Sequence, residues 1–549
     1  MCIVIESHFN SGSSVRAMYD VIINGGGPVG MGLAIDLGQR GLSVAVVERY
    51  ETPQPIPKGQ NLTQRTVEHF HFWNCERALR TAHPIPEGGG IGGITAYRTL
   101  LGDHAQNWLD RSMVGDFYFR AHARLPQYAT EQVLRDRVAE IPNIDVRLGW
   151  SGVGLAQDAE SVTLDIAPRQ GGARETLRGR YLVGCDGSHS FVRRAAGISE
   201  TAEDHARQMA LLVFDSPELD TLLARYPGKA FYNVLNPENE GYWWFFGRVD
   251  HGKSWFFHAP VPDGVTAETF DFEGLLHRAV GTPFALRLDH VGFWDMRFSL
   301  ADQYRKGRVF IAGDAAHSHP PYGGYGINSG FEDAVNLGWK LAAACQGWGS
   351  ESLLDSYHEE RHGVFASTAR DFIARFIRQD KEFLERFDPD RDADAFLAAW
   401  EQRADMDEVI NFAPNYAGSS VINGGVGRPS ARGDHRHEAR AGHHLSPAQL
   451  GAGGNVFDVL GEGFTLFLLD GDPSGQAARF VEAAEALELP LHVQLSDDLD
   501  LRDRLGHEAV LVRPDQFVAW AGRNGDAREI LSTVTGRDAV EGRIRRNAS

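Results

Sequence analysis

The sequence predicts an α/β protein built from a Rossmann-like dinucleotide-binding domain, an antiparallel β-sheet inserted into it, and a further small α/β domain at the C-terminus. Three observations support this fold class. A glycine-rich turn, Gly25-Gly26-Gly27-Pro28-Val29-Gly30, lies between an apolar run and a helical pattern. Two later apolar runs end in acidic-glycine turns, Asp186-Gly187 and Gly313-Asp314. Alternating aromatic residues lie between these two turns, as in antiparallel strands.

The glycine-rich turn has the context that a dinucleotide site requires. An apolar strand, 20–23, precedes it and a helical stretch, 31–40, follows it. Gly25 permits the tight turn, Gly27 lets the backbone approach a pyrophosphate, and Gly30 lets the helix pack close to the sheet. The helix N-terminus then faces the phosphates. Glycine turns are also common as purely structural elements, so the motif predicts a dinucleotide site only together with these flanking segments.

A carboxylate in the expected place supports the same interpretation. The second apolar strand, 43–47, ends in Glu48, close to the spacing of about 20 residues at which an acidic residue accepts the ribose hydroxyls. Glu48 therefore favours an adenosine without a 2'-phosphate. This first region alone suits a nicotinamide dehydrogenase and an FAD protein equally well.

The two acidic-glycine turns decide between these classes. An apolar strand runs into Asp186-Gly187 and another runs into Gly313-Asp314, which continues into a loop rich in Pro, Tyr and Gly, 317–328. With these motifs the chain resembles the class A flavoprotein monooxygenases, the single-component aromatic hydroxylases of the p-hydroxybenzoate hydroxylase and phenol hydroxylase type. The resemblance covers about residues 18–375 and implies a Rossmann-like FAD-binding domain interleaved with an antiparallel-sheet substrate domain.

The resemblance implies a set of residues that contact FAD. Asp314 would hydrogen-bond the ribityl chain, and Pro321 would line the isoalloxazine ring. The amides of Ile327 and Asn328 would point to the pyrimidine carbonyl and stabilise negative charge on the reduced flavin. Alternatively, Asp186 and Asp314 each form an Asx turn that caps the next helix. The expected cofactor-binding residues are Gly25, Gly27, Pro28, Gly30, Glu48, Lys58, Gln127, Asp186, Asp314, Gly326, Ile327 and Asn328.

Aromatic residues between the two acidic turns form the candidate substrate surface. Two runs, 241–246 and 255–257, predict antiparallel strands. Side chains alternate between the two faces of a strand, so Trp244 and Phe246 share one face. We expect these two residues, together with Tyr325, to line a flat apolar pocket. The alternative is that the aromatic residues form ordinary sheet core.

The resemblance also implies a reaction. NADPH or NADH would reduce bound FAD, O2 would add at the flavin C4a atom, and the resulting hydroperoxide would hydroxylate a phenol or catechol ring, with a substituted or nitro-catechol as one lead. Only one dinucleotide fingerprint is visible, which fits a nicotinamide that binds transiently. A flavin-dependent halogenase or a reductase on the same scaffold, and a catalytically silent FAD-binding protein, are the alternatives.

The group that removes the phenol proton is not identified by the resemblance. Some phenol hydroxylases carry an acid in the segment that matches Gln60-Asn61, and neither of these residues can act as a base. His319, Tyr232 and Tyr322 are the candidates, and Pro321 completes the expected catalytic set. Many relatives carry threonine in this loop, so Tyr322 and Tyr325 are departures that we expect to shape substrate choice.

The remaining chain predicts a long helix or helix pair over 353–387, a charged stretch, and a restart of strand and helix patterns near 441. The last region resembles the thioredoxin-like C-terminal domain of phenol hydroxylase relatives, but it contains no cysteine, which excludes thiol chemistry there. The expected domains are 18–200 and 301–385 for the two parts of the FAD-binding domain, 201–300 for the substrate-binding sheet, 386–440 for a helical segment and linker, and 441–549 for the thioredoxin-like domain.

Composition and charge indicate the cellular compartment of the protein and the classes of partner that it can bind. The 549 residues carry a net charge of −20, which argues against nucleic acid and an anionic membrane surface as partners. No apolar run approaches the length of a membrane span, and residues 1–16 lack the pattern of a signal peptide. Four scattered cysteines predict neither disulfides nor a metal site and fit a reducing cytoplasm. We therefore expect a cytoplasmic enzyme whose partners are a small aromatic substrate, O2 and NAD(P)H, with a homodimer as one form of assembly.

Overall fold

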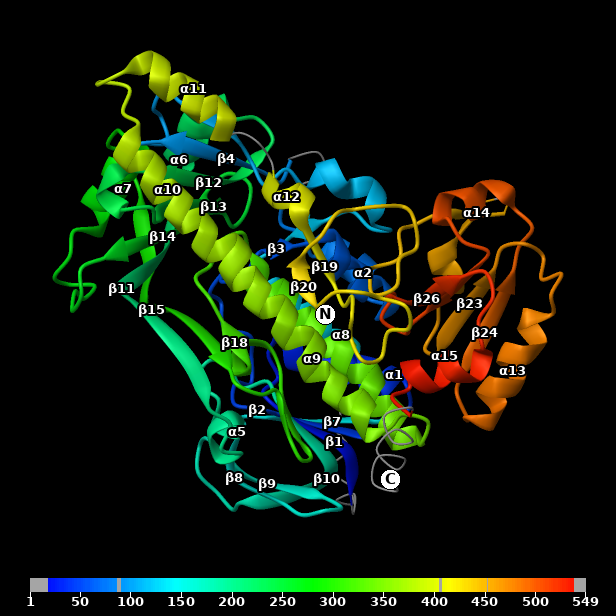
Figure 1. Ribbon diagram of the computed structural model, residues 1–549. Coiled ribbons are helices and arrows are strands. Elements are labelled where there is room, and N and C mark those ends of the chain that lie inside the picture. The colour runs from blue at the N-terminus through cyan, green and yellow to red at the C-terminus, as the bar shows by residue number, and fades with distance from the viewer. Residues whose placement is uncertain (1–17, 86–89, 404–406, 452, 538–549) are drawn as a thin grey trace, which may run out of the picture.

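Two large β-sheets, a set of long helices and a C-terminal domain make up the protein (Figure 1). The computed structural model describes residues 18–85, 90–403, 407–451 and 453–537, and the N-terminal stretch discussed above lies outside these ranges. The predicted fold class is confirmed: an α/β domain, an inserted sheet that is mostly antiparallel, and a C-terminal α/β domain follow one another as expected.

The first sheet has a parallel centre. Its strands follow the order β16-β17-β10-β1-β2-β7, in which β17, β10, β1, β2 and β7 are parallel, and β9 joins β10 to β8. Its innermost strands are rich in Val and Ile and buried on both faces, as parallel sheets require. The strands are β1 (Tyr19–Asn24), β2 (Val44–Glu48), β7 (Ile144–Leu148), β8 (Trp150–Gln157), β9 (Val162–Pro168), β10 (Glu175–Gly184), β16 (Arg305–Lys306) and β17 (Val309–Ile311).

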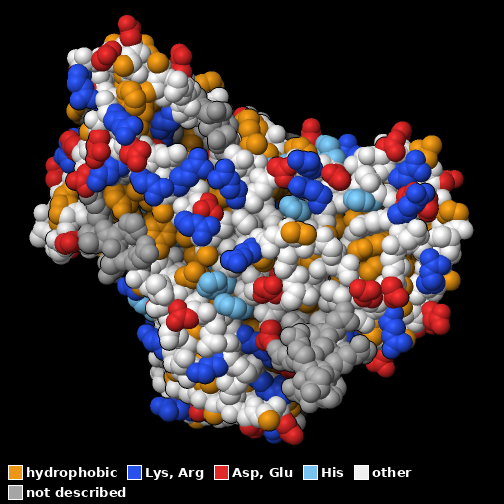
Figure 2. Space-filling view, in the orientation of Figure 1, with side chains coloured by type: hydrophobic (Ala, Val, Ile, Leu, Met, Phe, Trp, Pro, Cys, Tyr) orange, Lys and Arg blue, Asp and Glu red, His pale blue; other side chains and the backbone are white. Residues whose placement is uncertain are grey.

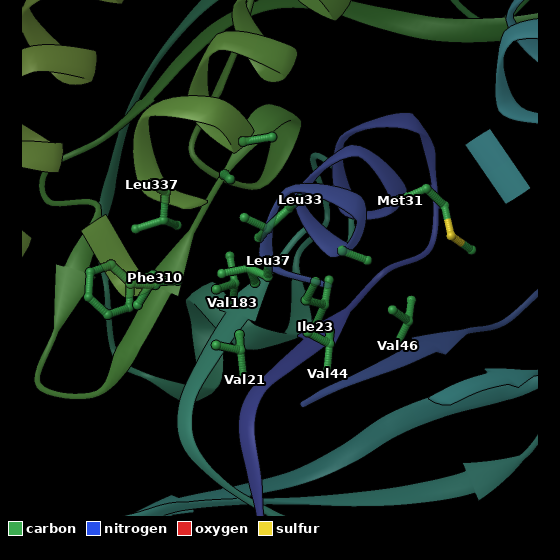
Figure 3. Close-up of a cluster of buried hydrophobic side chains, with 14 of the residues drawn as sticks. Val21, Ile23, Met31, Leu33, Leu37, Val44, Val46, Val183, Phe310 and Leu337 are labelled. Carbon is green, nitrogen blue, oxygen red and sulfur yellow. The ribbon is translucent and has the colours of Figure 1, made fainter. Parts of the chain in front are cut away.

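Two helices cover one face of this sheet. Figure 3 shows Leu33 and Leu37 of α1 (Pro28–Gln39) and Leu337 of α8 (Tyr325–Gln346) above side chains of the central strands. These side chains belong to one buried cluster that includes Val21 and Val183. Both helices begin near the carboxyl end of the sheet, so their N-termini lie beside the strand ends.

The second sheet follows the order β18-β15-β11-β14-β13-β12-β4-β5 and is antiparallel except for the β12–β4 pair. β4 and β5 lie inside the range 18–200 that we assigned to the FAD-binding domain, yet they pair with β12 because Ile94 and Ala96 join the core of the second sheet. The strands are β4 (Gly92–Tyr97), β5 (Ala105–Trp108), β11 (Glu200–Asp215), β12 (Lys229–Leu235), β13 (Trp243–Arg248), β14 (Ser254–Val261), β15 (Arg287–Ala301) and β18 (His317–Ser318).

The predicted long helix runs diagonally across the molecule in Figure 1. It consists of α9 (Glu351–Ser367), a π-helical segment (Thr368–Ala374) and α10 (Arg375–Arg386). The expected linker after it is packed rather than extended, since β19 (Phe412–Asn415) pairs with β20 (Ser430–Arg432). Two short helices precede that pair, α11 (Ala393–Arg403) and α12 (Asp407–Asn411).

The C-terminal domain has a mixed four-stranded sheet in the order β24-β23-β25-β26. Its core continues into the first domain, because Trp339 and Leu353 share a buried cluster with Phe464 and Leu511. The elements are β23 (Phe464–Leu468), α13 (Gln476–Ala486), β24 (Leu491–Leu495), α14 (Leu499–Leu505), β25 (Ala509–Val512), β26 (Val518–Gly522) and α15 (Ala527–Val534).

Acidic and basic side chains are interspersed over most of the face drawn in Figure 2, apart from a row of Lys and Arg side chains across its upper middle. No helix in the described part of the chain combines the length and the apolar character needed to cross a membrane. Within the same residues, no group of three or more His, Cys, Asp or Glu side chains is arranged to hold a metal ion.

Candidate functional site

The carboxyl ends of the parallel strands bring the three sequence motifs together. β1 leads into the glycine turn, β2 ends in Glu48, β10 leads to Asp186, and β17 leads to Asp314. These four strands are neighbours in the order β17-β10-β1-β2. Ligands of open parallel sheets bind at this edge. Segments almost 300 residues apart in the sequence therefore border one site.

The glycines of the first turn have two different roles. Gly25 has φ +112°, and a Cβ there would lie 2.2 Å from the carbonyl oxygen of Cys185. A Cβ on Gly30 would lie 1.9 Å from the carbonyl oxygen of Gly25, so these two glycines permit the packing of the protein itself. A Cβ on Gly27 would meet nothing within 4 Å. Gly27 and Pro28 begin α1, and the space beside Gly27 is where a pyrophosphate would meet the helix N-terminus.

Glu48 is held in place by backbone amides. Its carboxylate accepts hydrogen bonds from the amides of Gly26 and Tyr50, both at 2.7 Å. Each carboxylate oxygen carries a second lone pair, so these contacts leave acceptor capacity for ribose hydroxyls. The predicted role of Glu48 fits this arrangement.

Asp186 makes the contacts of a helix cap. Its carboxylate accepts from the Ser190 hydroxyl at 2.5 Å, the Val192 amide at 3.1 Å and the Asn24 side chain at 3.0 Å. The capping alternative therefore describes these contacts, and a direct role of Asp186 in cofactor binding stays a prediction. The contact with Asn24 also ties the end of β10 to the end of β1.

Asp314 is the carboxylate that faces open space at this edge. Its side chain is exposed and makes no hydrogen bond within the described residues, although surrounding protein raises its pKa by desolvation. The exposed ammonium of Lys58 lowers that pKa, which places the two groups within electrostatic reach of each other. Gln127 braces the same region, since its side chain accepts from the Gly59 amide at 3.2 Å. Lys58 and Gln127 thus lie beside the predicted cofactor position.

The loop 317–328 ends at the N-terminus of α8. Gly323 and Gly324 adopt positive φ values of +63° and +69°, and α8 then begins at Tyr325 without a side-chain cap. The amides of its first turn, which include those of Gly326, Ile327 and Asn328, have no acceptor within the helix. The Asn328 side chain anchors the loop, because it accepts from the Thr63 amide at 2.9 Å and donates to the Asn61 carbonyl at 2.8 Å.

His319 lies under this loop as a neutral side chain with one free acceptor. Its Nδ1 donates to the Pro320 carbonyl at 2.5 Å, so Nε2 is unprotonated, and no partner for Nε2 lies among the described residues. Burial lowers the pKa of His319 to about 4, which makes it a weak base. Pro321 is exposed at the start of the loop. An unpaired buried nitrogen beside Gly326 fits a site that is completed by a ligand.

The aromatic residues facing this loop are not the pair that we expected. Trp243, not Trp244, faces the loop, and its ring lies 4.4 Å from that of Tyr322. Trp244 and Phe246 are instead buried in the core on the opposite face, where helix α7 (Phe272–Val280) covers the sheet. The expectation that these two residues line the pocket is wrong, because alternation defines two faces but not which of them a helix covers.

Tyr232 also lies in that core and is not placed to act as a base. Its hydroxyl donates to the Lys229 carbonyl at 3.0 Å and accepts from Arg248 at 3.2 Å. Tyr322, by contrast, is surrounded by rings on the loop side, with Trp108 at 5.9 Å and Phe376 stacked at 5.6 Å. Burial raises the pKa of Tyr322 well above its ordinary value, so its hydroxyl stays protonated.

Trp108, Phe245 and Glu408 are residues of this site that sequence reasoning missed. Trp108 lies 6.0 Å from Phe245, centroid to centroid, and both face the loop. Glu408 accepts from the Tyr325 hydroxyl at 2.7 Å, and burial raises the pKa of Glu408 to about 7. Tyr325 thus binds a carboxyl group and does not present a free hydroxyl. No motif marks these three residues, although the alternation on β13 could have suggested Phe245.

Comparisons with known proteins match this geometry. A family profile described as "FAD binding domain" covers residues 18–371, and one described as "Aromatic-ring hydroxylase, C-terminal" covers residues 438–538. The chain is 32% identical to a rifampicin monooxygenase of Streptomyces venezuelae, over 94% of this chain and 98% of that protein. It is 31% identical to a 4-methyl-5-nitrocatechol 5-monooxygenase of a Burkholderia species, over 92% and 94% of the two chains. The crystal structure of the flavin-dependent monooxygenase PieE in complex with FAD and substrate superposes with a TM-score of 0.81 at 26% identity, covering 95% of this chain and 100% of that one.

Proposed function

The chain belongs to the FAD-dependent aromatic-ring hydroxylases, and from that premise we propose that it uses NADPH or NADH and O2 to hydroxylate a phenol or catechol ring. The observation that carries the proposal is an aromatic surface at the loop 317–328, which we call the flavin loop. Trp243 and Phe245 of β13, Trp108 of β5 and Tyr322 of the loop form it. A group of aromatic rings of this kind offers ring contacts to a planar aromatic substrate.

Polar groups within the same surface supply places for the substituents of such a ring. Asn233 of β12 pairs in register with Phe245, and Phe245 pairs with His258 of β14. Residues directly opposite on paired strands share a face, so all three lie in one row. Within the described chain, both polar atoms of the Asn233 side chain and Nδ1 of His258 are buried without a partner. Unpaired buried polar groups fit hydroxyl or carbonyl substituents better than a purely apolar ligand.

The residues of the first domain would hold the cofactor and orient it toward that surface. FAD, when bound, would carry the reducing equivalents of NADPH or NADH and activate O2. The N-terminus of α1 beside Gly27 would bind the pyrophosphate, Glu48 the ribose, and Asp314 the ribityl chain. The uncapped amides of Ile327 and Asn328 would stabilise negative charge on the ring. The buried aromatic wall would exclude water from the reacting atoms.

Oxygen insertion is the test. Purified holoprotein would be mixed with NADPH or NADH and a panel of phenols, catechols, resorcinols and nitro-catechols under 18O2, with NAD(P)H oxidation and peroxide release followed together. We expect at least one compound to accelerate oxidation with little peroxide and to give a product containing one 18O atom. Accelerated oxidation that yields only peroxide or halogenated product, across the whole panel, would contradict the proposal.

A further inference from the structure

Arg124 is a buried cation that has no anionic partner among the described residues. It ends the short strand β6 (Ala123–Arg124), and its side chain is almost fully enclosed, with 3% of the residue exposed. Its Nη1 donates to the Ala230 carbonyl at 2.6 Å, and no carboxylate of the described chain lies within ion-pair distance of it. Burying a charge without a counter-charge destabilises a fold. A cation kept in this state points to an anionic ligand.

The backbone of Arg124 lies next to the flavin loop. β6 pairs with β3 (Asn61–Leu62), which places Arg124 opposite Asn61. The Asn61 carbonyl accepts from the Asn328 side chain at 2.8 Å, and a Cβ on Gly324 would lie 3.1 Å from Cβ of Asn61. One residue, Asn61, therefore separates Arg124 from the first turn of α8.

The guanidinium itself lies on the substrate face of the second sheet. A Cβ on Gly247 would come within 2.6 Å of Nη2, and the guanidinium carbon lies 5.4 Å from the ring of Phe231 and 5.9 Å from that of Phe256. Phe231 and Gly247 are paired in register, two residues from the row that contains Phe245. Arg124 thus places positive charge at the edge of the aromatic surface.

Among the described residues, the charged and titratable groups that act on Arg124 leave its charge uncompensated, and two of them, Tyr232 and Arg248, lie on the α7 face of the sheet. On β12, the Tyr232 hydroxyl has a pKa raised by burial and is therefore neutral. On β13, Arg248 is a second cation, and it forms its own ion pair with Asp220. The imidazole of His83 accepts from the Arg124 amide at 3.3 Å, and burial lowers its pKa. Burial also lowers the pKa of Arg124, to about 9, so that the guanidinium is protonated at neutral pH.

We infer that Arg124 binds the reacting oxygen of the aromatic substrate as a phenolate, so that a buried cation rather than a base activates the ring; this inference rests on the proposed function. The hydroxyl proton would leave to solvent as the substrate binds, while Arg124 keeps its own protons and donates a hydrogen bond to the oxygen. The electron pair left on that oxygen enriches the ring carbons ortho and para to it. This accounts for a site in which Gln60-Asn61 cannot accept a proton and His319 is a weak base.

The test compares the pKa of a bound phenol between variants. Holoprotein would be titrated with 4-nitrophenol, whose phenolate is coloured, and difference spectra would be recorded against pH for the wild type, Arg124→Gln, Arg124→Lys and Arg248→Gln. An opposite charge nearby lowers a pKa by about 1 to 3. We expect the pKa of the bound probe to lie below that of the free probe in the wild type, to rise by about 1 to 3 in Arg124→Gln, and to recover in Arg124→Lys.

Arg248→Gln is the matched control because Arg248 is also buried and also lies over a ring, that of Trp255 at 4.4 Å, but is paired. It should melt at a lower temperature and leave the probe's pKa unchanged. Arg124→Gln removes a buried hydrogen bond but no ion pair with a described residue, so it should lower the melting temperature by less than Arg248→Gln does. That result excludes misfolding as the cause of a changed titration.

Three further outcomes distinguish a role of Arg124 in phenolate binding from a role in FAD binding, and the inference from the proposed function. An unchanged pKa of the bound probe in Arg124→Gln would overturn the inference. A loss of FAD affinity in that variant, measured by flavin fluorescence, with the probe's pKa unchanged would also overturn it, because Arg124 would then serve the cofactor. If the wild type binds the probe as a phenolate through Arg124 but inserts no 18O into any compound, the inference is supported and the proposed function fails.

Discussion

Gly27 and Gly30 belong to one turn, but a side chain would meet different neighbours at the two positions. The backbone of Gly25 would collide with a side chain at position 30, whereas the protein leaves open space at position 27. A requirement for glycine at position 27 therefore comes from what binds there and not from the fold. Substitution can separate the two requirements.

Gly27→Ala should fold like the wild type but bind FAD about tenfold more weakly or worse, because its methyl group occupies space that the pyrophosphate needs. Gly30→Ala should lose stability by about 1 to 3 kcal/mol or more, because a Cβ 1.9 Å from a carbonyl oxygen forces α1 away from the sheet. Thermal unfolding of the apoproteins and fluorescence titration with FAD measure the two effects. A Gly27→Ala apoprotein that melts well below the wild type would contradict this division of roles.

Residues with a local signature were predictable from the sequence, and residues without one were not. The glycine turn, Glu48 and Asp314 follow apolar strands, and local spacing is sufficient to place them at one sheet edge. Arg124 and Glu408 have no such spacing. Only the folded structure shows that Arg124 is buried with no anionic partner among the described residues. Glu408 lies in a segment whose composition predicts a helical piece and a linker.

At the scale of elements, helix α12 reaches the flavin loop through Glu408. This carboxyl group meets the Tyr325 hydroxyl at the first residue of α8, and the nearby Arg111 donates to the Gly323 carbonyl at 3.1 Å. α12 thereby supports the turn that precedes the α8 amides. Because burial raises the pKa of Glu408 to about 7, this support depends on pH.

Glu408→Gln should abolish that pH dependence. A carboxyl group with a raised pKa binds more protons in the folded state, so its contribution is fully present below about pH 4.5 and is lost as pH rises through about 7. The wild type should therefore lose up to about 3 kcal/mol of unfolding free energy over that interval, and the variant should not. Urea unfolding of both proteins at pH 5 and pH 8.5 measures this loss of unfolding free energy. Equal losses in both proteins would show that other groups govern this interval.

Packing between elements explains why the strands of the second sheet were predicted correctly, whereas the face that is covered by a helix was not. The aromatic runs identified β13 and β14, and alternation divided their side chains correctly into two sets. Only the packing of α7 on one face decides which set becomes core. That contact joins residues about 30 positions apart, and alternation within a strand carries no information about it.

At the scale of the molecule, buried ion pairs connect the C-terminal domain to the first domain. Glu360 of α9 accepts from both terminal nitrogens of Arg513, at 2.6 and 3.0 Å, and from the Lys340 ammonium at 2.7 Å. Burial alone would raise the pKa of Glu360, but the charges of Arg513 and Lys340 hold it well below its usual range. Lys340 lies on α8, so the C-terminal domain contacts the helix whose N-terminus faces the predicted flavin position.

Glu360→Gln should destabilise the whole protein by about 3 to 5 kcal/mol, because it leaves two buried cations without their shared anion. Tryptophan fluorescence and flavin release should report one common transition in urea, at lower concentration than in the wild type. Glu359→Gln, at the neighbouring exposed contact with Ser420, should change stability by less than about 0.5 kcal/mol. Two separate transitions in the wild type would show that the C-terminal domain unfolds independently.

The alternation along β12, β13 and β14 also bears on how this enzyme can change over evolutionary time. On each strand, one set of side chains forms the core under α7 and the other set faces the aromatic surface. Most of these side chains are also buried, so substitutions there alter local packing, but they leave the core under α7 intact, and the cofactor edge lies in a different sheet altogether. New substrates are therefore accessible by single substitutions at every other position, and a library restricted to positions 231, 233, 243, 245, 256 and 258 would sample specificity while it spares the core under α7.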